Sequence, residues 1–123
     1  MSDSPTVFIV DDDTAAAESV AALLASVNLP FQIYRTAEDF LSHFRDSQRG
    51  CLVLDIRLPG MSGLELYQHL QDRELKIPTI FISGHMDADA CQQAMHEGAL
   101  ACLEKPYTGD DLCQMIQNAL QNS

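Results

Sequence analysis

The sequence predicts a doubly wound α/β fold of the (βα)5 type, in which a five-stranded parallel sheet carries helices on both of its faces. Short apolar runs rich in branched and aromatic residues alternate along the chain with longer segments of helical periodicity. Most of the runs are continuously apolar, which is typical of parallel strands buried on both faces. Alternation of this kind implies a sheet covered by helices on both sides, with right-handed crossovers limiting the topology.

The five expected strands are the apolar runs themselves, and they lie at residues 7–10, 31–34, 51–54, 79–82 and 100–103. The segments between them carry apolar residues three and four positions apart, the spacing of one helix face. Three helix starts are marked by a capping box, at residues 36–39, 62–65 and 108–111. Asp13 and Asp87 are expected to cap the first and fourth helices.

The length of 123 residues fits one compact domain, which we assign to residues 1–123. Hydrophobic residues make up 46% of the chain, enough for a core. No apolar run approaches the ~20 residues of a membrane span, and the start lacks the basic and apolar regions of a signal peptide. These features predict a cytosolic protein without a membrane partner.

The charge balance is strongly acidic, with 18 Asp and Glu residues against 7 Lys and Arg residues, a net charge of -11. Such a surface repels phosphate backbones, so this chain is not expected to bind nucleic acid directly. The acidic balance has two interpretations, general solubility or a local carboxylate cluster that binds a cation.

The four cysteines match no zinc-binding or C-x-x-C pattern. In a reducing cytosol they are expected to be small, mostly buried thiols, and a structural disulfide is not expected.

Polar side chains follow four of the expected strands. The first strand is followed by residues 11–13, all aspartates, the third by Asp55, the fourth by Ser83 and the fifth by Lys105. In an open α/β sheet, ligands bind beyond the carboxyl ends of the strands, so these side chains are expected to meet at one edge.

Crowded carboxylates repel one another, and a divalent cation relieves that repulsion. Hard oxygen ligands suit Mg²⁺ or Mn²⁺, and so small a cluster leaves places for water and for a phosphoryl oxygen. A carboxylate can act as nucleophile toward phosphorus, as in aspartyl-phosphate enzymes. Lys105 and Ser83 would then contact other oxygens of the transferring group.

Taken singly, each of these residues has an ordinary structural explanation. Asp13 is expected to be a helix cap rather than a ligand, and Asp11 or Asp12 alone would usually be a cap or a solvated loop residue. Asp55 could begin a turn, and Lys105 could be a surface lysine beside a turn proline. Only their joint placement at the strand ends favours a functional site.

From residue 6 to about residue 120, the sequence resembles the receiver domains of bacterial two-component response regulators, which have a flavodoxin-like fold. The resemblance rests on four motifs, residues 9–13 (IVDDD), 54–63 (LDIRLPGMSG), 82–85 (ISGH) and 104–107 (EKPY). The last two are most similar to the FixJ-type branch.

This resemblance implies that Asp55 is the phosphoacceptor and that the domain is a phospho-switch rather than an enzyme acting on other substrates. It implies that Asp12 binds Mg²⁺ directly, that Asp11 assists, often through water, and that Asp55 and the backbone carbonyl of Arg57 complete the protein ligands. It further implies that a sensor histidine kinase is the phosphodonor.

The resemblance also assigns roles around the phosphoacceptor. Ser83 takes the switch hydroxyl position, Lys105 contacts the phosphoryl group, and the bond between Lys105 and Pro106 is expected to be cis. Arg57 and His85 stand where family members tune dephosphorylation. The face formed by the fourth helix, fifth strand and fifth helix is expected to support homodimerisation or effector docking after phosphorylation.

One position departs from the family pattern, because receivers usually carry Tyr or Phe three residues before the lysine. Here that residue is Cys102, which is too small to report the switch in the way an aromatic ring does.

Two enzyme-like alternatives lack their defining motifs. A haloacid dehalogenase-type phosphatase needs a second Asp two residues after the nucleophile, where this chain has Arg57, and no G-x-G-x-x-G motif of a nucleotide-binding domain follows the first strand. A stand-alone receiver acting as an adaptor remains open beside the receiver half of a longer transcription factor. The FixJ-type resemblance favours the second, with transcription controlled by a DNA-binding domain outside these residues.

Overall fold

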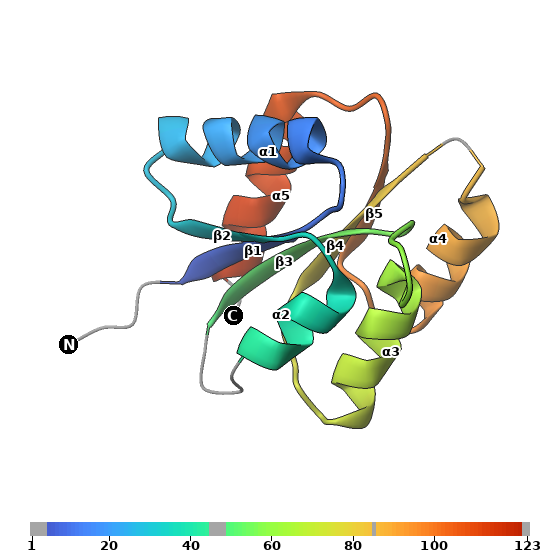
Figure 1. Ribbon diagram of the computed structural model, residues 1–123. Coiled ribbons are helices and arrows are strands. Elements are labelled where there is room, and N and C mark those ends of the chain that lie inside the picture. Colours follow the sequence, from blue (N-terminus) through green and yellow to red (C-terminus); the bar gives the residue numbers. More distant parts are fainter. Residues whose placement is uncertain (1–4, 45–48, 85, 122–123) are drawn as a thin grey trace.

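The computed structural model describes residues 5–44, 49–84 and 86–121, and these form one parallel five-stranded sheet flanked by helices (Figure 1). The strand order is β2-β1-β3-β4-β5. The strands are β1 (Thr6–Val10), β2 (Phe31–Tyr34), β3 (Gly50–Asp55), β4 (Thr79–Ser83) and β5 (Ala101–Glu104). The helices are α1 (Thr14–Ser26), α2 (Ala37–His43), α3 (Gly63–Asp72), α4 (Ala88–His96) and α5 (Gly109–Gln121). The predicted (βα)5 fold class is confirmed.

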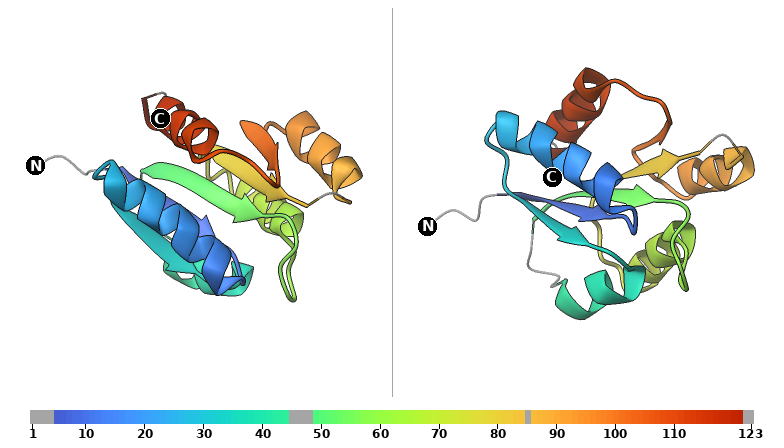
Figure 2. Two further views of the ribbon diagram at one scale, coloured as in Figure 1. Left: turned by 90° about the horizontal axis from the view of Figure 1, so that it is seen from above. Right: turned by 45° about the horizontal axis from the view of Figure 1, so that its top comes forward.

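Helices α1 and α5 cover one face of the sheet, and α2, α3 and α4 cover the other (Figures 1 and 2). Each face has its own hydrophobic core. Phe8, Leu54 and Phe81 point to the α2–α4 side. Their neighbours in the strands, such as Ile9 and Val53, point to the α1–α5 side. This alternation follows from the two-residue period of a strand, which sends successive side chains to opposite faces.

The prediction of strands buried on both faces is confirmed for the three central strands and is wrong for the edges. All residues of β4 and nearly all of β1 and β3 are buried. In β2, Gln32 and Ile33 are exposed, and β5 is only partly buried. Strand β5 also begins one residue later than expected, and Leu100 lies outside it and is exposed. Edge strands have one neighbour only, and here the helices leave their outer sides open to solvent.

The helix starts follow the capping signals in the sequence. Asp13 caps α1, because its carboxylate accepts hydrogen bonds from two backbone amides of the first turn. Ser62 and Glu65 form the complete capping box of α3. Thr36 and Thr108 each accept a hydrogen bond from the backbone amide three residues later. These side chains satisfy amides that the helix leaves without partners.

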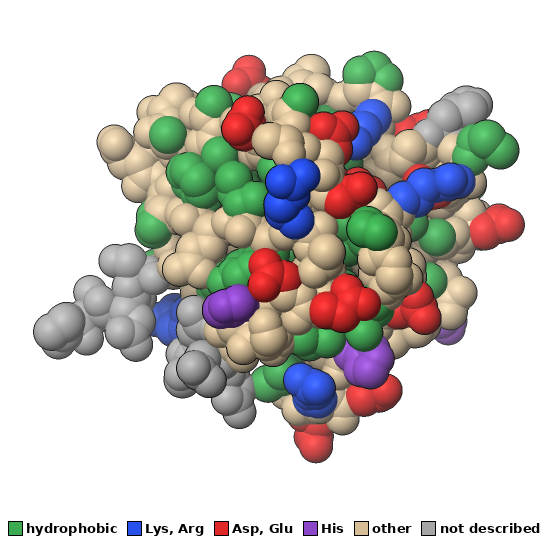
Figure 3. All heavy atoms as spheres, viewed as in Figure 1, with side chains coloured by type: hydrophobic (Ala, Val, Ile, Leu, Met, Phe, Trp, Pro, Cys, Tyr) green, Lys and Arg blue, Asp and Glu red, His purple; other side chains and the backbone are tan. Residues whose placement is uncertain are grey.

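Among the residues that the structure describes, no helix is both long enough and apolar enough to cross a bilayer. On the face shown in Figure 3, acidic side chains are widely spread, and the Lys and Arg side chains stand in separate places.

Candidate functional site

Three of the predicted carboxylates come together at the carboxyl edge of the sheet. Asp11 and Asp12 directly follow β1, and Asp55 is the last residue of β3. The two strands are parallel neighbours with Val10 paired to Leu54, so Asp11 and Asp55 leave the sheet side by side. Each of the three aspartates offers an oxygen, and these oxygens all lie within 4.8 Å of one another. The spacing and the hard oxygen donors fit one divalent cation.

The three carboxylates differ in their surroundings. Asp11 is buried and accepts a hydrogen bond of 3.0 Å from the backbone N–H of Asp13, whereas Asp12 is exposed. Asp55 is half-buried, and its Oδ1 accepts a hydrogen bond of 3.0 Å from the backbone N–H of Arg57. The backbone therefore orients Asp11 and Asp55, while Asp12 approaches from the solvent side.

Burial is the main reason why the pKa of Asp55 rises from its ordinary value to about 7. The negative charge of Asp11 and a hydrogen bond with its side chain raise this pKa further, whereas the Arg57 N–H and the charge of Lys105 lower it. Without a cation the site therefore disfavours ionisation of Asp55. A bound divalent cation would remove that disadvantage, because its charge favours the ionised form.

Ser83 and Lys105 reach the same edge from β4 and β5. Residues Ser83 and Glu104 are paired in the sheet, and the backbone N–H of Lys105 donates to the Ser83 carbonyl at 2.9 Å. Between β3 and β4, the N–H of Ile56 donates to the Ile82 carbonyl. Asp55 and Ser83 therefore end two adjacent strands, and Lys105 directly follows the third. The charge of Lys105 acts on Asp55. The Lys105–Pro106 bond is cis, as expected.

The residues at this edge match a known family. The model of the response regulator receiver domain family matches residues 7–117. The chain belongs to this family. It is a receiver domain of the kind found in two-component response regulators, as its sequence motifs predicted.

Curated relatives of this receiver domain include transcriptional regulators. The regulatory protein TdiR of Thauera aromatica is 41% identical over 115 residues, which cover 94% of this chain and 51% of TdiR. FixJ of Rhizobium meliloti (strain 1021) is 37% identical over 117 residues, 95% of this chain and 57% of FixJ. The chain thus spans about half the length of the curated relatives it matches.

Solved structures agree with this assignment. The response regulator StyR superposes with a TM-score of 0.91 at 42% identity, over 97% of this chain and 60% of StyR. FixJ-N superposes with a TM-score of 0.90 at 36% identity, over 100% of this chain and 98% of FixJ-N. The predicted resemblance to the FixJ-type branch is therefore confirmed in sequence and in fold.

The loop after Asp55 is held by a close approach that the sequence did not reveal. A Cβ atom added to Gly63, the first residue of α3, would lie 2.1 Å from the backbone carbonyl oxygen of Asp55. The N–H of Gly63 donates to the carbonyl of Ile56 at 2.9 Å. Only glycine lets the start of α3 rest against the backbone of the receiver's central aspartate.

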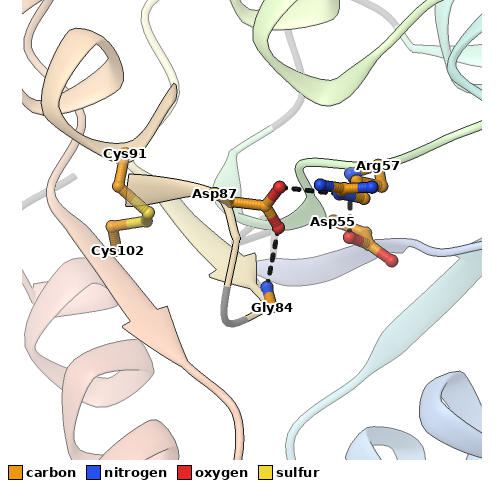
Figure 4. The surroundings of a disulfide bond; sticks show 6 residues. All are labelled: Asp55, Arg57, Gly84, Asp87, Cys91 and Cys102. Atoms are coloured by element: carbon orange, nitrogen blue, oxygen red, sulfur yellow. Dashed lines mark hydrogen bonds and ion pairs between the residues drawn. A yellow bond between two sulfur atoms is a disulfide. The ribbon is translucent and has the colours of Figure 1, made fainter. Parts of the chain in front are cut away.

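Arg57 and Asp87 form an ion pair that links two loops of the site. Arg57 Nε donates to Asp87 Oδ1 at 2.7 Å, and the Gly84 N–H donates to Asp87 Oδ2 at 2.8 Å (Figure 4). Burial raises the pKa of Asp87, but these hydrogen bonds together with the charges of Arg57 and Lys105 hold it below its usual range. Asp87 stands at the predicted cap position of α4, yet its side chain makes no capping bond. Its carboxylate tethers Arg57 instead.

The expectation of no disulfide is wrong for two of the four cysteines. Cys91 of α4 and Cys102 of β5 form a disulfide with a Cα–Cα distance of 5.9 Å, while Cys51 and Cys113 are free. The two partners stand 11 residues apart in no recognised motif. Only the packing of α4 against β5 brings them together, and sequence spacing cannot show that packing.

His85, expected near the site, lies outside the described residues.

Proposed function

We propose that Asp55 is the phosphoacceptor of this receiver domain and that phosphorylation requires Mg²⁺, or Mn²⁺ in its place. The observation that carries the proposal is the set of carboxylate oxygens of Asp11, Asp12 and Asp55 within 4.8 Å of one another. In the proposed site these three residues and the backbone carbonyl of Arg57 supply the protein ligands, and water completes the coordination.

The chain's own groups support this chemistry. The hydrogen bond from the Arg57 N–H fixes the orientation of the Asp55 carboxylate, so one of its oxygens can attack phosphorus in line with the leaving group. The ammonium of Lys105 pairs with one phosphoryl oxygen and the hydroxyl of Ser83 donates to another. A cation bound at the carboxylates would neutralise charge that develops on the transferring group.

We further infer that a sensor histidine kinase in the cytosol donates the phosphoryl group and that the domain controls transcription through a DNA-binding domain in a longer protein. The regulators TdiR and FixJ are about twice the length of the matched region, which leaves room for such a domain in them. The acidic chain is itself poorly suited to bind DNA. Its route to an output would be the face of α4, β5 and α5, which would support effector docking or a homodimer and on which α4 carries the exposed Met95.

Mass spectrometry after incubation with a small-molecule phosphodonor and Mg²⁺ tests the proposal. The chain should gain one phosphoryl group, and Asp55→Asn should gain none. Asp12→Asn should lose Mg²⁺ binding and phosphorylation together. Asp13→Asn is the matched control, since it removes the same charge one residue away, while Asn remains a good helix cap. Stoichiometric phosphorylation of the Asp55→Asn variant would contradict the proposal. So would an equal Mg²⁺ affinity of the Asp12→Asn and Asp13→Asn variants.

A further inference from the structure

The disulfide joins α4, which begins beside the site, to β5, which ends there. Cys91 belongs to the first turns of α4, and Cys102 is the second residue of β5 (Figure 4). Both side chains are partly exposed, and both pack beside the core on the α2–α4 face. Cys51, by contrast, is fully buried, and its burial raises the pKa of its thiol to about 12. Solvent therefore reaches the residues of the pair, whereas Cys51 is shielded from it.

Each cysteine is linked to the surroundings of Asp55, Cys91 through hydrogen bonds and Cys102 through the chain itself. The N–H of Cys91 donates to the backbone carbonyl of Asp87 at 2.9 Å, and the Asp87 carboxylate holds Arg57. On the other side, Cys102 precedes Lys105 by three residues in the same strand and loop. The disulfide thus joins the helix turn that carries Asp87 to the strand that leads to Lys105.

Helix α4 makes few apolar contacts with the sheet: Ala90 packs partly buried against the core, and polar contacts of Asp87 and Glu97 hold its two ends. Ala94 is its only fully buried residue among those described, whereas α3 buries Leu66, Tyr67 and Leu70. One buried methyl group contributes far less apolar burial than two leucines and a tyrosine. Because α4 buries so little, the covalent bond to β5 should restrain this helix noticeably.

We propose that Cys91 and Cys102 form a reversible redox modification site, whose oxidation locks α4 to β5 and restrains the switch, and whose reduction releases α4. Its effect on output rests on the proposed phosphorylation of Asp55. For a chain proposed to act in the cytosol, where thiol buffers keep cysteines reduced, such a pair is typical of reversible sensing rather than permanent cross-linking.

The oxidant is a low-molecular-weight disulfide. The thiolate of one cysteine attacks it, which forms a mixed disulfide and releases one small thiol. The second cysteine then attacks the mixed disulfide, which forms the bond between Cys91 and Cys102 and releases the second small thiol. The protein loses two electrons and two protons, and both small thiols carry them away. A reduced dithiol reverses the two steps.

Thiol counting in glutathione buffers tests the modification on the whole chain. In oxidised buffer the wild type should retain two free thiols, and in reduced buffer four. At intermediate ratios of reduced to oxidised glutathione, the mean number of free thiols should lie between two and four. The Cys91→Ser/Cys102→Ser variant should retain two free thiols in both buffers, and Cys113→Ser, the matched control in α5, should still lose two on oxidation. Four free thiols in the oxidised wild type would overturn the proposal.

Amide hydrogen exchange tests the effect on the switch. Exchange in α4 should speed up by an order of magnitude or more on reduction, with α1 unchanged. Phosphorylation should change α4 exchange in the reduced chain and much less in the oxidised chain. Equal α4 exchange in the two redox states would overturn the inference. Phosphoryl incorporation is measured in the same samples, so its absence in both redox states would reveal a failure of the proposed function instead.

Discussion

Replacing Gly63 by alanine tests the contact between α3 and the proposed phosphoacceptor. The new Cβ would lie 2.1 Å from the Asp55 carbonyl oxygen, where real Cβ contacts are essentially never shorter than 3.0 Å. The start of α3 and the Asp55 peptide must therefore separate by roughly 1 Å. Because the clash is with backbone rather than with a flexible side chain, no rotamer change can relieve it.

The expected cost is about 2–3 kcal/mol of unfolding free energy, the upper range for an overpacked site. For a domain of this size that corresponds to a drop in Tm of roughly 10 °C. The same displacement moves the Asp55 carboxylate and its hydrogen bond with the Arg57 N–H. A misplacement of about 1 Å can slow a positioned reaction by roughly 100-fold, so phosphorylation should slow by about that factor in the fraction that remains folded.

The matched control is Gly109→Ala, which changes the first residue of α5. Its Cβ would meet only the flexible side chain of Leu23, at 3.3 Å. This variant should be within about 0.5 kcal/mol of the wild type, since alanine restricts the unfolded chain and Leu23 can adjust. Urea denaturation and the rate of phosphorylation by a small phosphodonor are the two assays. If Gly63→Ala matches Gly109→Ala in both, α3 does not rest on Asp55 as described.

Three further results are expected. In metal-free protein, Asp55→Asn should raise the unfolding free energy by roughly 1–2 kcal/mol at pH 8 and hardly at all at pH 4. The reason is that the folded pKa of Asp55 is raised from 3.8 to about 7, so the wild type loses stability as the pH rises through that window and Asp55 is forced to ionise. An equal gain at both pH values would contradict this. A double-mutant cycle of Arg57→Ala with Asp87→Asn, measured by urea unfolding, should give a coupling free energy of about 0.5–1 kcal/mol between the two residues. A coupling of zero would show that the ion pair does not stabilise the fold. Reduction of the bond between Cys91 and Cys102 should lower the unfolding free energy by up to about 3 kcal/mol, the loop-closure value for so short a ring, and an unchanged Tm after complete reduction would refute this.

The fold and the acidic site could be predicted from the sequence because both depend on local signals. Continuous apolar runs mark central strands, and capping residues such as Ser62 mark helix starts. The polar residue at or after the end of each strand must lie at the carboxyl edge of a parallel sheet, so the sequence predicts that Asp11, Asp55 and Lys105 lie together.

The features that the sequence did not reveal are contacts between segments whose relative placement depends on packing. Asp87 was expected to cap its own helix, but Arg57, 30 residues away, takes its carboxylate. The disulfide depends on the distance between α4 and β5, which no motif encodes. The role of Gly63 depends on how closely α3 approaches β3, and a glycine after a serine cap does not indicate that distance.

The separation of the interior into two cores has a consequence for how the domain opens. The sheet lies between them, and apolar side chains of one core do not belong to the other. Water that enters beside α4 therefore reaches only one of the two, and the packing of α1 and α5 can survive that event. We expect α4 to open at a lower free energy than α1 and α5, because Ala94 is the only buried residue of α4 among those described. A receiver built in this way could transmit its state by partial melting of one side while the other side keeps the sheet folded.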